Sequence, residues 1–252
     1  MKQFFLTMFI CCISNHNSAQ ESIHIFEKLK KAYPTFIKDL KGNQLVLFDN
    51  SSLDFDDGKI KSQTEFFRNP DIEDMFLLQY VSFNSKQKTD AGRIRNEAFF
   101  KKMYGNSEDE VKKKLVNVTW CPKLVNQKIM VTTINGVDKK IIDLSNELDR
   151  HPDLKKYLLN IGGTFNWRTI AGTNRLSMHS FGMTIDINIM YSDYWQWSCN
   201  CSDESKKLKY RNQIPKKLVD IFEKYGFIWG GNWTHFDTMH FEYRPELLLV
   251  NH

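Results

Sequence analysis

The sequence predicts an α+β fold, in which a small antiparallel sheet packs against helices and an N-terminal extension precedes this unit. Segments 183–189 and 240–243 alternate apolar and polar residues, a period of two that is typical of strands. Segments 141–150 and 214–225 instead have the apolar spacing of helices. Strands interspersed with helices favour an α+β architecture.

The composition favours one domain, or one domain with a subdomain. The chain has 252 residues, of which 41% are apolar and 13% are aromatic, enough to bury one good core. Its net charge of +5 is spread along the chain, without a basic stripe interleaved with aromatic residues. We therefore expect no nucleic-acid partner, whereas contact with an acidic polymer is compatible with this charge.

The N-terminus predicts a secretory signal peptide at residues 1–19. A positive charge is followed by an apolar run at 4–13 and by polar residues, with cleavage expected after Ala19. The run is too short to remain as a membrane span, and no second apolar run of 18 residues follows. A frayed apolar N-terminus is one alternative. A lipid anchor at Cys11 or Cys12 is another, disfavoured by the large residues before them.

The extension at residues 20–114 contains weaker signals. We expect a helix at 23–33, a short strand at 44–48 and a second helix at 90–105. The acidic stretch 50–59 lacks the ligand spacing of a calcium loop, so a solvated turn is expected there. Arginines in the second helix could reach into a substrate cleft, although solvated helix charges are the commoner outcome.

Strand and helix signals alternate ahead of the segment at 183–189. Strands are expected at 116–120 and 128–134, with Asn135-Gly136 as the turn that follows. A further helix is expected at 154–159, and Gly162-Gly163 is expected to end it.

Three cysteines lie outside the predicted signal peptide. This number is odd, so at least one of Cys121, Cys199 and Cys201 is a free thiol or pairs between chains. Cys199 and Cys201 are spaced too closely for half of a zinc site, and no second pair accompanies them, so surface or disulfide cysteines are expected there. A bridge from Cys121 to one of them is open in an exported protein.

Residues of the two alternating strands point to a metal site. Asp186 lies on the polar face of the first strand, and His240 and Glu242 share one face of the second. Gly182 permits the tight turn needed to bring His179 over the same face. Zinc readily takes imidazole and carboxylate ligands, and catalytic sites typically use three of them. The sequence therefore predicts one zinc ion per chain, held by His179, Asp186 and His240.

Asp237 is the candidate general base. It precedes His240 by three residues, where its carboxylate could receive a proton from water without ligating the metal. Zinc lowers the pKa of its water toward about 7 and polarises a carbonyl, which is the main need in amide hydrolysis. These residue types predict metal-assisted hydrolysis.

At these positions the chain resembles a known family, the zinc D-alanyl-D-alanine carboxypeptidases and dipeptidases and the L-alanyl-D-glutamate endopeptidases that cut cell-wall peptides. The family pattern S-x-H-x-x-G-x-A-x-D, followed by an acid-x-x-H, is matched at Ser177, His179, Gly182, Asp186, Asp237 and His240. Thr184 replaces the usual Ala, and the base is Asp rather than Glu, which looks more like the endopeptidase branch. The resemblance covers roughly residues 115–249. It implies a hedgehog/DD-peptidase-like fold, zinc as cofactor and the stem peptide of peptidoglycan as partner.

The resemblance also implies an arginine that holds the substrate carbonyl oxygen as charge develops. Arg168 is the first choice by its place ahead of the zinc histidine, and Arg175 is the second. Either arginine could instead bind only a surface carboxylate. Ser177 would support the site or contact substrate, and otherwise it is a turn residue.

His235 and Glu242 are candidates for supporting roles. His235 precedes Asp237 by two residues and could contact substrate or stand behind the ligands, or be purely structural. Glu242 shares a face with His240, so it is expected to orient that imidazole through a hydrogen bond.

Together these observations predict a zinc metallopeptidase, exported to the periplasm or cell envelope, that hydrolyses peptide bonds in peptidoglycan stem peptides. It would act as a D,D-carboxypeptidase or as an L-Ala-D-Glu endopeptidase. The expected organisation is a signal peptide at 1–19, an extension at 20–114 packed on the catalytic unit, and a peptidase domain at 115–252. One alternative is a non-catalytic zinc-containing wall- or peptide-binding module on the same fold, as the hedgehog signalling domain exemplifies. Another is a metal-free wall-binding or structural protein.

Overall fold

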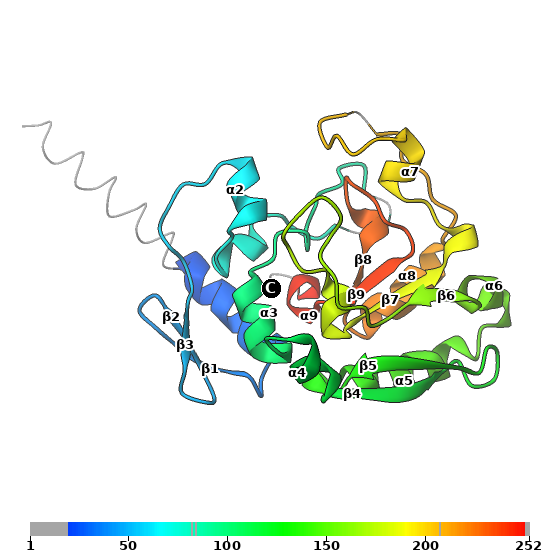
Figure 1. Ribbon diagram of the computed structural model, residues 1–252, viewed down its shortest axis with the longest axis horizontal. Coiled ribbons are helices and arrows are strands. Elements are labelled where there is room, and N and C mark those ends of the chain that lie inside the picture. Colours follow the sequence, from blue (N-terminus) through cyan, green and yellow to red (C-terminus); the bar gives the residue numbers. More distant parts are fainter. Residues whose placement is uncertain (1–19, 82, 84, 207, 250–252) are drawn as a thin grey trace, which may run out of the picture. The chain divides into compact units, whose positions relative to one another are not determined.

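The computed structural model describes residues 20–81, 83, 85–206 and 208–249, so the predicted signal peptide lies outside the described residues (Figure 1). The chain divides into two compact units, Met1–Lys59 and Ile60–His252. Within the described ranges, no helix is both long and apolar enough to cross a membrane. The mixture of helices and small antiparallel sheets confirms the predicted α+β class.

In its described part, the first unit combines a helix at residues 20–32 with a three-stranded antiparallel sheet. The strands, in sheet order, are β1 (Ile37–Lys41), β2 (Gln44–Leu47) and β3 (Ser52–Asp54). The helix and β2 agree with the sequence prediction. β3 does not, because it lies in the stretch predicted as a solvated turn. Its polar residues form a strand through pairing with β2, from Gln44 opposite Asp54 onward, so tertiary context overrides local propensity.

The second unit is organised around a four-stranded antiparallel sheet (Figure 1). Its strands, in sheet order, are β6 (Ile161–Gly163), β7 (Thr184–Asn188), β9 (His240–Tyr243) and β8 (Phe227–Trp229). β7 and β9 are the central strands, and in their register Asp186 lies directly opposite His240. The pairing therefore makes neighbours of residues that are 54 positions apart in the sequence.

A hairpin and two helices support this sheet. β4 (Leu115–Trp120) and β5 (Gln127–Thr132) pair antiparallel, and α5 (Val137–Leu148) follows them. Asn135 and Gly136 both have positive φ, and α5 begins immediately afterwards, four residues earlier than predicted. Helix α8 (Lys216–Lys224) packs on the sheet, since the ring of Phe222 stacks on Phe241 of β9 with centroids 3.8 Å apart.

Helix α3 (Glu97–Tyr104) is shorter than the predicted helix at 90–105. Asn96 caps its start by accepting a hydrogen bond from the Phe99 N–H at 2.8 Å, and Gly105 with φ 140° ends it. Arg93 and Arg95 therefore precede the helix. Their side chains are only 17% and 10% exposed and form ion pairs, so the expectation of solvated helix charges is wrong.

The other helical segments of the described chain are short. They are α2 (Gln63–Arg68), α4 (Glu108–Lys112), α6 (Lys155–Leu158), α7 (Trp195–Cys199) and α9 (Pro245–Leu248), with 3-10 helices at Glu73–Phe76, Ile134–Gly136, Pro152–Leu154, Met178–Phe181, Ile189–Tyr191 and Gly230–Asn232.

One expectation about a local feature is corrected, and the cysteine pairing that the sequence left open is resolved. Gly162 and Gly163 do not simply end a helix, because they form the edge strand β6 with Gly163 opposite Asp186. A Cβ at Gly162 would lie 3.2 Å from the Asp186 Cβ, so a glycine there leaves room for that side chain. Cys199 and Cys201 form a disulfide with each other, and Cys121 is buried as a free thiol rather than bridged to either.

Candidate metal centre

Three elements bring the predicted ligands together. His179 lies on the 3-10 helix Met178–Phe181, Asp186 at the middle of β7 and His240 at the start of β9. Gly182 ends the 3-10 helix with φ 65°, and a Cβ there would lie 2.5 Å from Leu115. This position therefore favours glycine for its backbone conformation, and any other residue would also force the Leu115 side chain to shift.

The imidazole and carboxylate groups of these residues converge. His179 Nε2 lies 3.1 Å from Asp186 Oδ2 and 3.3 Å from His240 Nδ1. His240 Nδ1 lies 3.0 Å from Asp186 Oδ1. All three ligand atoms lie within 4.8 Å of one another, so these residues could hold one metal ion.

The outer nitrogens of both imidazoles have partners of their own. His179 Nδ1 donates to the Thr164 carbonyl at 2.8 Å, and His240 Nε2 donates to Glu242 Oε2 at 3.1 Å. With the outer nitrogens protonated, the inner nitrogens of neutral rings carry lone pairs that face each other and a carboxylate. Such an arrangement is stable only with positive charge between the rings, which is how metal-binding histidines are usually held.

The pKa shifts of His240 and Asp186 also indicate that positive charge is stabilised between these residues. Burial would lower the pKa of His240, but the hydrogen bonds to Asp186 and Glu242 outweigh it and raise the pKa to about 10. Burial would raise the pKa of Asp186, yet the two imidazoles hold it well below its usual range. Two nitrogens and one carboxylate form a donor set that fits zinc and leaves a coordination position for substrate or water.

Asp237 lies beside this centre; the residue is half-buried, and its Oδ1 atom is buried. Burial, followed by the charge of Asp186, raises the pKa of Asp237 to about 6. Among the described residues its Oδ1 has no hydrogen-bond partner. A buried carboxylate oxygen without a partner is costly unless something else binds it, so Asp237 is available to a proton or a water.

Glu242 links His240 to Arg95 and Arg244, two contacts that the sequence did not indicate. Its Oε2 also accepts from Arg95 Nη2 at 3.1 Å, and its Oε1 accepts from Arg244 Nη1 at 3.2 Å. Glu242 and Arg244 are 0% exposed. The predicted contact between Glu242 and His240 is thus present. Arg95, which precedes α3, and Arg244, which follows β9, balance the negative charge of the Glu242 carboxylate.

Arg168 and Ser177 lie next to the helix of His179. The Ser177 N–H donates to the Arg168 carbonyl at 2.9 Å, and the Arg168 N–H donates to Ser180 Oγ at 3.0 Å. The Arg168 side chain is exposed, and its Nη1 lies 3.5 Å from the Thr169 carbonyl. Ser177 Oγ accepts from the His179 N–H at 3.4 Å, so it caps the 3-10 helix as a turn residue would.

His235 is not among the three converging ligands. Its Nδ1 lies 2.7 Å from Asp90 Oδ2, and its Nε2 lies 3.1 Å from the Glu204 carbonyl. Burial would lower the pKa of His235, but Asp90 outweighs it and raises that pKa. This pair involves residues 145 positions apart, and no local pattern in the sequence identifies it.

Comparison with known proteins agrees with this geometry. A family model described as D-alanyl-D-alanine carboxypeptidase matches residues 171–243, which include His179, Asp186, Asp237 and His240. The resemblance inferred from the sequence motifs is thereby confirmed. None of the curated proteins matches the chain.

Proposed function

We propose, from the match of residues 171–243 to the D-alanyl-D-alanine carboxypeptidase family model, that the protein is a zinc-dependent peptidase acting on the stem peptides of peptidoglycan. The observation that carries the proposal is the approach of His179 Nε2, His240 Nδ1 and the Asp186 carboxylate to within 3.0–3.3 Å of one another. These three residues would hold the metal. When bound, zinc supplies a Lewis acid that polarises a carbonyl and makes water more acidic.

The side chains around the three ligand residues would have two roles, to orient the imidazoles and to transfer a proton. Thr164 and Glu242 fix the orientation of the two imidazoles by accepting their outer N–H groups. The Oδ1 atom of Asp237 would accept the proton of the attacking water and then deliver it to the nitrogen of the departing amine. Because Asp237 Oδ1 is buried, this oxygen would remain shielded from bulk solvent during both transfers.

We propose Arg168 for stabilising the carbonyl oxygen as negative charge develops on it. Its backbone is bonded to Ser177 and Ser180 on either side of His179, while its guanidinium is exposed. An exposed guanidinium on an anchored loop can turn toward a bound peptide. Arg175 is the weaker candidate for this role, since its Nη2 is engaged by the Arg93 carbonyl at 2.6 Å.

The test is digestion of purified peptidoglycan fragments, with products identified by mass spectrometry and zinc content measured on the same sample. We expect about one zinc per chain, cleavage that stops with a chelator, and recovery when zinc is restored. Asp237→Asn should retain zinc and lose activity by a factor of about 10² to 10⁴, the usual contribution of a general base. Asp109→Asn, at an exposed carboxylate of α4, is the matched control and should remain active.

The same samples separate the competing functions. A variant Asp237→Asn that binds zinc and wall fragments as the wild type does, when neither protein cleaves them, would favour a non-catalytic binding module. Absence of zinc from the purified protein would contradict the proposal that the peptidase is zinc-dependent. The masses of the products identify the bond, because loss of a terminal D-Ala and cleavage between L-Ala and D-Glu differ in mass.

We also propose that the protein is exported to the periplasm or cell envelope, on the basis of the signal pattern in residues 1–19. Cell fractionation and N-terminal sequencing of the native protein test this. A chain that begins after Ala19 supports export, and an intact N-terminus in the cytoplasm contradicts it.

A further inference from the structure

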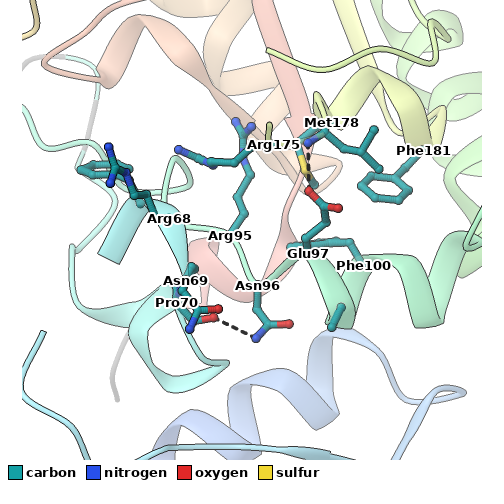
Figure 2. A pocket seen from close by; sticks show the side chains of 13 residues that line it. Arg68, Asn69, Pro70, Arg95, Asn96, Glu97, Phe100, Arg175, Met178 and Phe181 are labelled. Carbon is teal, nitrogen blue, oxygen red and sulfur yellow. Dashed lines mark hydrogen bonds between the residues drawn. The ribbon is translucent and has the colours of Figure 1, made fainter. Parts of the chain in front are cut away.

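A cavity with three arginines lies beside the metal centre. It has a volume of about 150 Å³, and the arginine pocket, as we call it, is lined by Arg68, Arg95, Arg175, Phe67, Phe100 and Met178 (Figure 2). It adjoins a wider cleft of about 1000 Å³ that shares Phe67, Arg68 and Arg175. In Figure 2 the three arginine side chains lie on one side of the pocket, and the rings of Phe100 and Phe181 lie on the other.

The acidic groups around the arginine pocket already have partners. Glu97 accepts from the Leu176 N–H at 2.9 Å and pairs with Lys101 at 2.6 Å. In the adjoining cleft, Asp90 pairs with His235 at 2.7 Å, and Glu204 pairs with Arg93 at 2.6 Å. In these contacts, none of the three acidic side chains pairs with Arg68 or Arg175.

Arg175 is a half-buried cation without an acidic partner. Its Nη2 donates to the Arg93 carbonyl at 2.6 Å, and its guanidinium lies 5.7 Å from the Phe67 ring. Across the described ranges, no carboxylate lies within 4.0 Å of Arg175 or Arg68. Burial and then the charge of Arg93 lower the pKa of Arg175, although Glu204, Glu97 and Glu242 oppose this from a distance; a carboxylate in direct contact would stabilise the charged guanidinium further.

Arg95 connects the pocket to the metal centre. It lines the pocket, and its Nη2 bonds the same Glu242 oxygen that accepts from His240. Met178, also in the pocket wall, directly precedes His179. The pocket is therefore one residue away from the ligand His179 along the chain and one side chain away from His240 through Glu242.

We propose that the arginine pocket binds a carboxylate of the peptide substrate, with Arg175 and Arg68 as donors, so that the enzyme selects acidic peptides. The inference rests on the proposed peptidase function. The planar guanidinium offers paired N–H donors that match a carboxylate, and the aromatic walls suit the methylene groups that carry it. Arg68 and Arg95 lie outside the segment that matches the family model, whereas Arg175 lies inside it, so the pocket combines residues from both parts of the chain.

The experiment compares stem peptides in which each carboxylate in turn is replaced by a carboxamide. For wild type, one such replacement should raise KM by about tenfold to a hundredfold, the loss expected for a hydrogen bond to a charged group. Arg175→Gln should raise KM by a similar factor for the acidic peptide but not for that amide, with kcat little changed. Arg68→Gln, at an exposed residue, should act in the same direction, whereas Arg150→Gln, at an exposed arginine after α5, should have no effect.

Equal changes of KM for acid and amide in both pocket variants, or no change in either, would overturn the proposal. If Arg175→Gln fails to fold by circular dichroism, Arg68→Gln provides the decisive measurement. If the wild type cleaves none of the peptides, the proposed activity fails, and calorimetric binding of the same peptides tests the pocket separately. A preference of wild type for acid over amide that disappears in Arg175→Gln would support the pocket, and equal binding would reject it.

Discussion

Replacing Glu242 by Gln would remove one negative charge from the most enclosed part of the metal centre. Glu242 is 0% exposed and contacts His240, Arg95 and Arg244 at 3.1, 3.1 and 3.2 Å. Burial alone would raise its pKa, but Arg95 and His240 outweigh this and lower the pKa to about 2. The residue is therefore a carboxylate at every pH of practical interest, and glutamine changes its charge while keeping its shape.

The size of the effect follows from these contacts. A glutamine amide keeps one acceptor oxygen but turns an NH₂ group toward the N–H donors of its neighbours, and two buried guanidiniums lose a counter-charge. Breaking a buried ion pair in this way costs about 3–5 kcal/mol. For a unit of this length that is a fall in melting temperature of roughly 6–20 °C. Because His240 also loses its orienting carboxylate, zinc affinity should fall by about tenfold to a hundredfold.

Two measurements examine the prediction. Thermal denaturation of the zinc-free protein measures the fall in melting temperature, and competition with a zinc-binding dye measures the zinc affinity. Glu108→Gln is the matched control, because Glu108 forms an exposed pair with Lys112 at 2.7 Å, and exposed pairs contribute little. If Glu242→Gln melts and binds zinc like the control, then Glu242 is not required to balance the arginines or to orient His240, and this account is wrong.

Three further outcomes are expected. Chelation should lower the melting temperature and zinc should restore it, since a ligand that binds only the folded state stabilises it; identical melting curves would contradict this. Gly231→Ala should destabilise the fold by about 1–3 kcal/mol in urea denaturation, because an added Cβ would lie 2.1 Å from the buried Trp229 ring. An unchanged midpoint would mean that the ring moves aside. The raised pKa of His235 means that its pair with Asp90 contributes fully below pH 6.5 and loses this contribution as pH rises through the raised value. Asp90→Asn should lower the His235 pKa in an NMR titration, and an unaltered titration would refute the pairing.

Local patterns were sufficient for the strands that hold the ligands. The alternation at 183–189 and 240–243 predicted β7 and β9, because the side-chain period of a strand is visible in a few residues. The spacing around His179 and Asp186 indicated a metal site for a similar reason, since zinc restricts the residue types it accepts. Asn135-Gly136 likewise marked a real change of direction, although it leads into α5.

Local sequence patterns did not predict features that depend on a partner far away in the sequence. Gly162-Gly163 showed no strand propensity, and only pairing with β7 makes it β6. The helix predicted from residue 90 begins at Glu97, after the Asn96 cap, and Arg93 and Arg95 ahead of it form ion pairs with Glu204 and Glu242. A charge on a surface helix and a charge buried against a distant carboxylate look the same in sequence.

The sequence by itself determined the α+β class, the strands beneath the site and the identity of the residues that could meet a metal, because these depend on short-range periodicity and on ligand chemistry. The tertiary structure alone decided that Asp186 faces His240, that Glu242 is balanced by Arg95, and that Arg175 and Arg68 have no acidic partner in the described chain. Those features depend on register and burial, which arise from packing between segments as far as 147 residues apart.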